Sequence, residues 1–185
     1  SSAASDVYKR QGAINIENIQ NILNNIQVVE EPKLPFPQAD SFERVINLCE
    51  LLKQKGFISK NDITQNYDFD YRQTNYYSSA ARYLGLIKDV YENRQTGCSL
   101  TQEGFRIFNL PIVERQLEFV KLILTHTVFQ NTLNLYFEKG DAPTKDEVVE
   151  IMKEAQLYNI DSEQTYRRRA STIISWINWI LGLIE

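Results

Sequence analysis

The stretch that decides the fold runs from Asp70 to Thr101 and reads DYRQTNYYSSAARYLGLIKDVYENRQTGCSLT. Its first part predicts a helix over Asp70–Leu84, because apolar and small residues recur there at helical spacing. Its second part holds two short strand-like runs, Leu86–Tyr91 and Cys98–Thr101, on either side of the turn-prone segment ENRQTG. Two such runs around a turn predict a β-hairpin.

Three further helices are expected around this stretch. Ser41 marks the start of a helix that Gly56 ends, a short helix fits Lys60–Asn66, and another fits Gln102–Phe108. The order helix, helix, helix, hairpin is typical of a winged helix, a variant of the helix-turn-helix. The sequence therefore predicts a winged-helix unit over residues 41–110.

Residues 111–185 repeat this order in part. One long amphipathic helix is expected over Ile112–Lys139, and Thr144 with Glu147 forms a capping box for the next. A third helix begins after Asp161 or Ser162 and runs to about residue 181. The closing letters GLIE are interpreted as a candidate first strand of a second hairpin.

The third helices of the two units share sequence features: each begins near a Gln-Thr pair and ends in LGLI. We therefore expect residues 111–185 to form a second helix-turn-helix unit of winged-helix-like type. The predicted fold class is mainly α, with tandem winged-helix or helix-turn-helix units and a small β-hairpin wing.

The N-terminal residues are interpreted separately. Ser1–Gln11 resembles the codon-by-codon translation of a sequencing-library adapter, so we treat it as an artefact and the remainder as a fragment that lacks its upstream domain. Residues 12–40 predict a short helix within Gly12–Gln27, followed by a linker made stiff by Pro32, Pro35 and Pro37.

Composition limits the classes of function. The net charge is −4, and Ser1–Gln11 contributes +1 (one acid, two bases), which leaves −5 for the rest. An acidic chain argues against indiscriminate DNA binding, but allows positive charge to gather on one face. Cys49 and Cys98 are far apart and form no CxxC motif, which is typical of free thiols in the cytoplasm. No apolar run approaches the roughly 20 residues of a membrane span.

The predicted helix Asp70–Leu84 has two opposite faces at 100° per residue. Its buried face holds Tyr77, Ala80, Ala81 and Leu84, and its outer face holds Arg72, Asn75, Ser79 and Arg82. Arginine and asparagine are the side chains that read guanine and adenine edges in the major groove. We expect these four outer residues to contact DNA, the alternative being an ordinary solvated face. Tyr71 or Tyr76 is a further candidate for the sugar-phosphate backbone.

The last helix shows the same division. Tyr166, Ala170, Ile173, Ile174, Ile177 and Leu181 form its apolar arc, and Arg168, Ser171, Thr172 and Ser175 lie opposite, flanked by Arg167 and Arg169. We expect Arg167, Arg168, Arg169, Ser171 and Ser175 to contact DNA. Because the preceding segment is acidic, one of the three arginines, Arg167 or Arg169, is instead expected to pair with a carboxylate.

Two other residues are singled out. Arg94 lies in the turn of the wing and is a candidate phosphate contact, the alternative again being a solvated turn. Trp179 projects toward the polar side of the last helix. A tryptophan in such a place favours an inter-domain or subunit interface, and a homodimer is left open.

Three segments carry a resemblance to a known family: RQTNYYSSAARYLGLI (72–87), SLTQEGFRIF (99–108) and TYRRRASTIISWINWI (165–180). They resemble the tandem winged-helix modules that accompany type II restriction endonucleases and related restriction-modification proteins. The resemblance covers residues 42–185. It implies site-directed binding of double-stranded DNA beside a nuclease or methyltransferase domain of the same polypeptide, a domain that this sequence lacks.

We find no pattern for catalysis in the sequence. His126 is the only histidine, and it has no partners at the spacing of a zinc site or a catalytic triad, so a structural role is expected. No Gly-rich phosphate loop occurs, and no metal or cofactor site is expected. Two hypotheses remain: a non-catalytic DNA-recognition fragment, or a winged-helix module for protein association or dimerisation. The acidic charge favours the second, and the polar helix faces favour the first.

Overall fold

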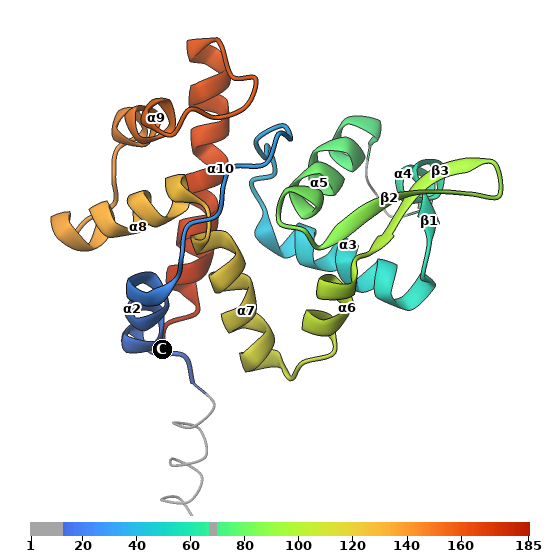
Figure 1. Cartoon of the computed structure of the whole chain (residues 1–185), viewed down its shortest axis with the longest axis horizontal. Coiled ribbons are helices and arrows are strands. Elements are labelled where there is room, and N and C mark those ends of the chain that lie inside the picture. Colours follow the sequence, from blue (N-terminus) through green and yellow to red (C-terminus); the bar gives the residue numbers. More distant parts are fainter. Residues whose placement is uncertain (1–12, 67–69) are drawn as a thin grey trace, which may run out of the picture.

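The computed structural model describes residues 13–66 and 70–185. Within these residues the chain is mainly helical, with nine helices and one small antiparallel sheet (Figure 1). The segment interpreted as an adapter, Ser1–Gln11, lies outside the described residues.

The first group of elements, which we call the sheet unit, spans residues 42–108. Its elements are α3 (Phe42–Lys55), β1 (Ile58–Ser59), α4 (Lys60–Asn66), α5 (Tyr71–Tyr83), β2 (Ile87–Glu92), β3 (Gln95–Leu100) and α6 (Gln102–Phe108). All four helices occur where the sequence predicts them.

Local capping explains where these helices begin. The Ser41 side chain accepts the N–H of Arg44 at the start of α3. Asp70 and Gln73 form a reciprocal capping box at the start of α5, so that two backbone donors are satisfied. Gly56, in a positive-φ conformation (82°), ends α3.

The sheet has the strand order β1-β3-β2. β2 and β3 form the predicted hairpin, joined by Asn93 and Arg94, which both have positive φ (51° and 61°). Two positive-φ residues characterise a type I′ turn, whose twist matches that of the strands. β1 was not predicted: it pairs with β3 through Ile58 and Ser59. A Cβ at Gly97 would lie 2.2 Å from the Ile58 carbonyl oxygen, so this close pairing requires glycine.

The second group of elements, the helical unit, consists of α2 (Ile16–Asn25), α7 (Ile112–Leu124), α8 (Thr127–Lys139), α9 (Lys145–Glu154) and α10 (Glu163–Gly182). α10 packs against α8 and α9, and α2 packs against α7. The predicted capping box of Thr144 and Glu147 is confirmed at the start of α9, and Ser162 is the N-cap of α10.

One prediction about this unit is wrong. The single helix expected over Ile112–Lys139 is divided between α7 and α8, because His126 adopts an extended conformation (φ −92°, ψ 126°). The break is stabilised by tertiary contact: the Thr125 carbonyl accepts the N–H of Val29 at 2.9 Å. Within the segment GLIE, Ile184 forms an isolated parallel bridge with Ile14, and a second hairpin stays a prediction.

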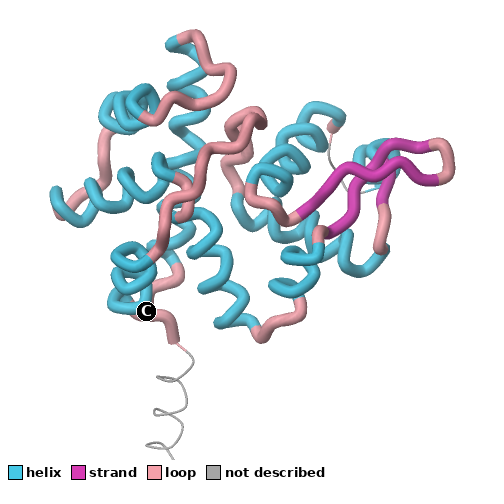
Figure 2. The backbone as a smooth tube through the Cα atoms, in the orientation of Figure 1, coloured by secondary structure: helices cyan, strands magenta, loops and turns pink. Residues whose placement is uncertain are grey.

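Residues 26–41, which we call the strap, join α2 to α3 without helix or strand (Figure 2). The prolines explain this irregular backbone, as predicted, but part of the strap, around Phe36 and Ala39, is buried. Phe36 is buried, stacks on Phe129 of α8 at 5.8 Å between ring centroids, and meets Tyr83 of α5 edge-on at 5.4 Å. The strap thus contacts both units.

The interior between the units is aromatic. Trp176 of α10 is fully buried, stacks on Phe129 at 5.2 Å and meets Phe42 of α3 edge-on at 5.1 Å. Cys49 and Cys98 are free thiols and are both buried. Burial raises the pKa of both thiols, to about 11 for Cys98, so both remain protonated at neutral pH.

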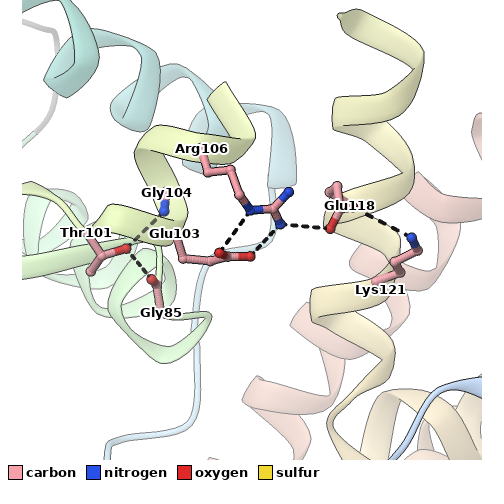
Figure 3. Close-up of polar contacts among 7 residues, drawn as sticks. All are labelled: Gly85, Thr101, Glu103, Gly104, Arg106, Glu118 and Lys121. Atoms are coloured by element: carbon pink, nitrogen blue, oxygen red, sulfur yellow. Dashed lines mark hydrogen bonds and ion pairs between the residues drawn. The ribbon is translucent and has the colours of Figure 1, made fainter. Parts of the chain in front are cut away.

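Polar contacts connect the hairpin, α6 and α7 (Figure 3). Thr101 donates to the Gly85 carbonyl at 2.6 Å and accepts the N–H of Gly104 at 3.0 Å, which begins α6 beside the hairpin. Arg106 of α6 forms ion pairs with Glu103 at 2.6 Å and with Glu118 of α7 at 3.2 Å. These groups are largely exposed, so the ion pairs contribute little to stability. They help to orient α7 relative to α6.

Candidate nucleic-acid interface

The outer face of α5 holds the first group of predicted site residues. The predicted buried arc is confirmed, since Tyr77, Ala80, Ala81 and Leu84 are all buried. On the opposite side Arg72 is exposed, and Asn75 and Ser79 are half-buried. Arg82 is committed elsewhere: its Nη2 lies 2.6 Å from Asp89 Oδ1 of β2. It is therefore less available than Arg72 for an external ligand.

A groove lies between the hairpin turn and the start of α5. It has a volume of about 320 Å³, and its lining includes Lys60 and Asn61 of α4, Tyr71 of α5, and Arg94. Tyr71 is 65% exposed. The predicted wing residue Arg94 therefore lies close to the N-terminal turn of α5.

The three arginines of α10 have three different environments. Arg167 forms an ion pair with Asp146 of α9, which confirms that one of the three pairs with the acidic segment. Arg168 is exposed. Arg169 is half-buried, and its Nε is buried with no hydrogen-bond partner in the described structure.

A second groove, of about 430 Å³, lies between α5 and α10. Its lining includes Gln38 and Asp40 of the strap, Gln73 and Tyr76 of α5, Lys145 of α9, and Arg168 and Ser171 of α10. In Figure 1 the strap passes between α5 and α10. The two grooves thus border the same N-terminal half of α5.

The strap also changes the predicted outer face of α10. Thr172, expected on that face, is fully buried: it accepts the Ala39 N–H at 3.1 Å and donates to Asp40 Oδ1 at 2.9 Å. The prediction that Thr172 lies on the exposed face of α10 is wrong, because the strap covers this side chain. Ser171 and Ser175 are half-buried, and of these two Ser171 lines the groove.

Trp179 makes a contact within the chain. Its Nε1 donates to Glu43 of α3 at 2.8 Å, and its ring lies 4.5 Å from that of Phe42. It therefore connects α10 to the sheet unit, while a contact with a second molecule stays a prediction.

His126 belongs to a buried polar cluster with Glu31 and Tyr83. Its Nδ1 lies 3.0 Å from Glu31 Oε1, and its ring stacks on Tyr83 at 4.2 Å. The Tyr83 hydroxyl donates to both Glu31 oxygens, at 2.7 and 2.9 Å. Burial, and then the charge of Glu31, raises the pKa of Tyr83 above its ordinary value, so the hydroxyl remains a donor. This arrangement agrees with the structural role expected for His126.

The basic side chains fall into two groups. Some are paired with carboxylates, as Lys139 is with Glu147, whose pKa this hydrogen bond lowers to about 2. Others form no ion pair with any residue that the structure describes. Five of these are Arg72, Arg94, Lys145, Arg168 and Arg169, and Lys60 lies beside Arg94 in the first groove, whereas Lys33, Lys53, Lys55 and Lys88 line neither groove. The first five lie on α5, at the hairpin turn, or in the N-terminal parts of α9 and α10, so part of the unpaired positive charge lies on both sides of α5.

Sequence reasoning missed Gln73 and Lys145 as groove residues, and no sequence signal would have found them. Gln73 reads as a capping residue and Lys145 as the first residue of an acidic helix. Both line the same groove because it lies between elements that are far apart in the sequence, α5 on one side and α9 and α10 on the other.

Within residues 13–66 and 70–185, no helix has the length and apolar character that a membrane crossing requires. In the same residues, no three His, Cys, Asp or Glu side chains gather as a metal site would require.

The comparisons with known proteins identify a family. Residues 44–185 match a domain of unknown function, DUF7226, and the chain therefore belongs to this family. Neither a curated protein nor a solved structure matches the chain.

Proposed function

We propose that this chain binds double-stranded DNA, with α5 at base edges in the major groove and the unpaired cations at backbone phosphates. The observation that carries the proposal is the location of these cations on both sides of α5. The order of elements in residues 42–108 and the sheet order β1-β3-β2 support a winged-helix assignment, in which α5 is the recognition helix.

The exposed side chains of α5 suit base readout. Arg72 is exposed and unpaired, and arginine can donate two hydrogen bonds to guanine O6 and N7. Asn75, one turn further, suits adenine. At the adjacent hairpin turn, Arg94 suits a phosphate or the minor groove.

We assign α10 a different part in the same interface. The strap covers Thr172 and approaches the polar face of α10, so this helix does not present a free stripe for a second major groove. Arg168 remains exposed beside α5. The proposal is therefore that α5 reads bases while α10 holds the backbone next to it.

Replacing Arg72 by alanine tests this proposal. At the duplex sequence that the parent selects from a random library, we expect the binding free energy to weaken by about 1–3 kcal/mol, with relaxed preference at one base pair. Fluorescence anisotropy measures both effects. Arg106→Ala is the control, because Arg106 is paired with Glu103 and Glu118 away from α5. Equal affinities for both variants and the parent would argue against readout by α5.

The resemblance of three segments to restriction-modification modules supports a wider proposal. The chain would then be the recognition part of a larger polypeptide, and nuclease or methyltransferase chemistry would belong to another part of it. Recovery of the upstream coding sequence tests this directly.

A second candidate function, protein association, is favoured by two exposed apolar side chains. Phe105 of α6 is 57% exposed and Ile112 of α7 is 61% exposed, in a chain of net charge −4. Binding by this surface would be weakened by Phe105→Ser and affected little by salt, whereas DNA binding through phosphates declines steeply with salt.

A further inference from the structure

Arg169 differs from the other partly buried arginines of this chain. Arg82, Arg115 and Arg169 each have a buried Nε without a hydrogen-bond partner among the residues described. Arg82 and Arg115 nevertheless use their terminal nitrogens, for Asp89 and for Glu50. Arg169 makes no described hydrogen bond or ion pair with any of its nitrogens. A half-buried guanidinium without a partner loses hydration without compensation, which is costly unless a ligand supplies the acceptor.

A second cation, Arg168, and a tyrosine, Tyr76, lie next to Arg169. Burial lowers the pKa of Arg169, the nearby Tyr76 opposes this effect, and Arg168 lowers the pKa further. Arg168 and Tyr76 both line the groove between α5 and α10, as does Lys145. The carboxylate in that lining, Asp40, accepts a hydrogen bond from Thr172 at 2.9 Å.

Neutral donors approach the same groove from α5. Gln73 uses its Oε1 for the Asp70 N–H at 3.3 Å, while its side-chain NH₂ makes no described bond. Tyr76 contributes a hydroxyl group, and Ser171 another from α10. A groove that presents cationic and neutral hydrogen-bond donors together is suited to the oxygens of a phosphate group.

We propose that the groove between α5 and α10 binds a single phosphate group. Arg168, Tyr76 and Gln73 of the groove lining hold it, together with Arg169, which lies next to the lining residues Arg168 and Tyr76. This rests on the proposed function in one respect: in the DNA complex the phosphate belongs to the backbone beside the bases that α5 reads. Phosphate contacts fix the register of a protein on the duplex. A phosphate shared by both helices therefore fixes how α5 enters the major groove.

The chain provides a matched control for this proposal. Arg167 is on the same helical turn as Arg168 and Arg169, but it is paired with Asp146. We expect Arg168→Ala and Arg169→Gln each to weaken duplex binding about tenfold and to reduce the salt slope by roughly one unit, while Arg167→Ala changes neither. Thermal melting of each variant monitors folding.

Two further measurements separate this inference from the DNA-binding proposal. In the double variant Arg168→Ala/Tyr76→Phe, the fold-loss of duplex affinity should be smaller than the product of the fold-losses of the two single variants, because both side chains hold the same phosphate. If the parent binds duplex DNA but Arg168→Ala and Arg169→Gln behave as Arg167→Ala does, the groove inference is overturned and DNA binding stands. If the parent binds no DNA, the DNA-binding proposal fails, and an NMR titration with inorganic pyrophosphate tests the groove inference by itself. The Arg169 Nε–H resonance shifts during the titration if the inference is right, and stays unchanged if it is wrong.

Discussion

Replacing Trp176 by alanine is expected to lower the free energy of unfolding by about 3–5 kcal/mol, the largest effect of any single substitution considered. Trp176 is fully buried, stacks on Phe129 of the helical unit and meets Phe42 of the sheet unit edge-on. Its Nε1 donates to the Ala39 carbonyl of the strap at 2.7 Å. The substitution removes these contacts, leaves a cavity and leaves the buried Ala39 carbonyl without its hydrogen-bond donor. Urea denaturation followed by circular dichroism measures the loss.

Trp179→Ala is the control for this prediction. Trp179 is half-buried, and its hydrogen bond goes to the exposed Glu43. We expect a clearly smaller loss of stability than for Trp176→Ala. Equal losses for the two variants would contradict the conclusion that the units and the strap are joined mainly around Trp176.

The second large effect is expected from Glu31→Ala. Glu31 accepts the Tyr83 hydroxyl twice and contacts His126 Nδ1, all in a buried cluster. A buried polar group left without a partner costs about 1–3 kcal/mol, and here two groups lose their partner at once. Thermal and urea unfolding should therefore both show strong destabilisation.

The neighbouring Glu30 gives a matched control for this substitution. It has the same side chain one position earlier, is exposed and makes no described contact, so Glu30→Ala should change stability by no more than about 0.5 kcal/mol. Glu31→Gln keeps an oxygen acceptor for Tyr83 and should lie between the two. An unchanged stability of Glu31→Ala would mean that the strap contributes little to the fold.

Elements set by local chemistry could be predicted from the sequence. Ser41, Asp70 and the pair Thr144 with Glu147 cap helices through side chains three residues from the groups they bind. The hairpin follows from a turn between two short strand-like runs. Such interactions depend on neighbours in the sequence, so the pattern alone identifies them.

Elements set by distant contacts could not be predicted. β1 is a strand of two residues that exists because Gly97 allows β3 to approach Ile58. The break at His126 depends on Val29, which is nearly a hundred positions away and reaches the Thr125 carbonyl. The apolar periodicity of residues 112–139 continues across the break, and it therefore suggested one helix.

The candidate site shows the same division. Helix periodicity placed Arg72 on the exposed side of α5, and the acidic segment before α10 indicated that one arginine would be paired. The covering of Thr172 by the strap, and the groove between α5 and α10, arise from the packing of segments that are far apart in the sequence. The pattern of neighbouring residues in the sequence does not predict packing between such distant segments.

The measurement that tests the DNA-binding account most directly is the salt dependence of binding to a labelled duplex. If three or four of the unpaired cations contact phosphates, a plot of log K against log salt should have a slope of roughly −3, at about 0.9 per phosphate. The double variant Arg72→Ala/Arg168→Ala should bind more weakly and with a shallower slope. Parent affinity that is independent of salt, or a double variant that binds as tightly as the parent at every salt concentration, would contradict the account.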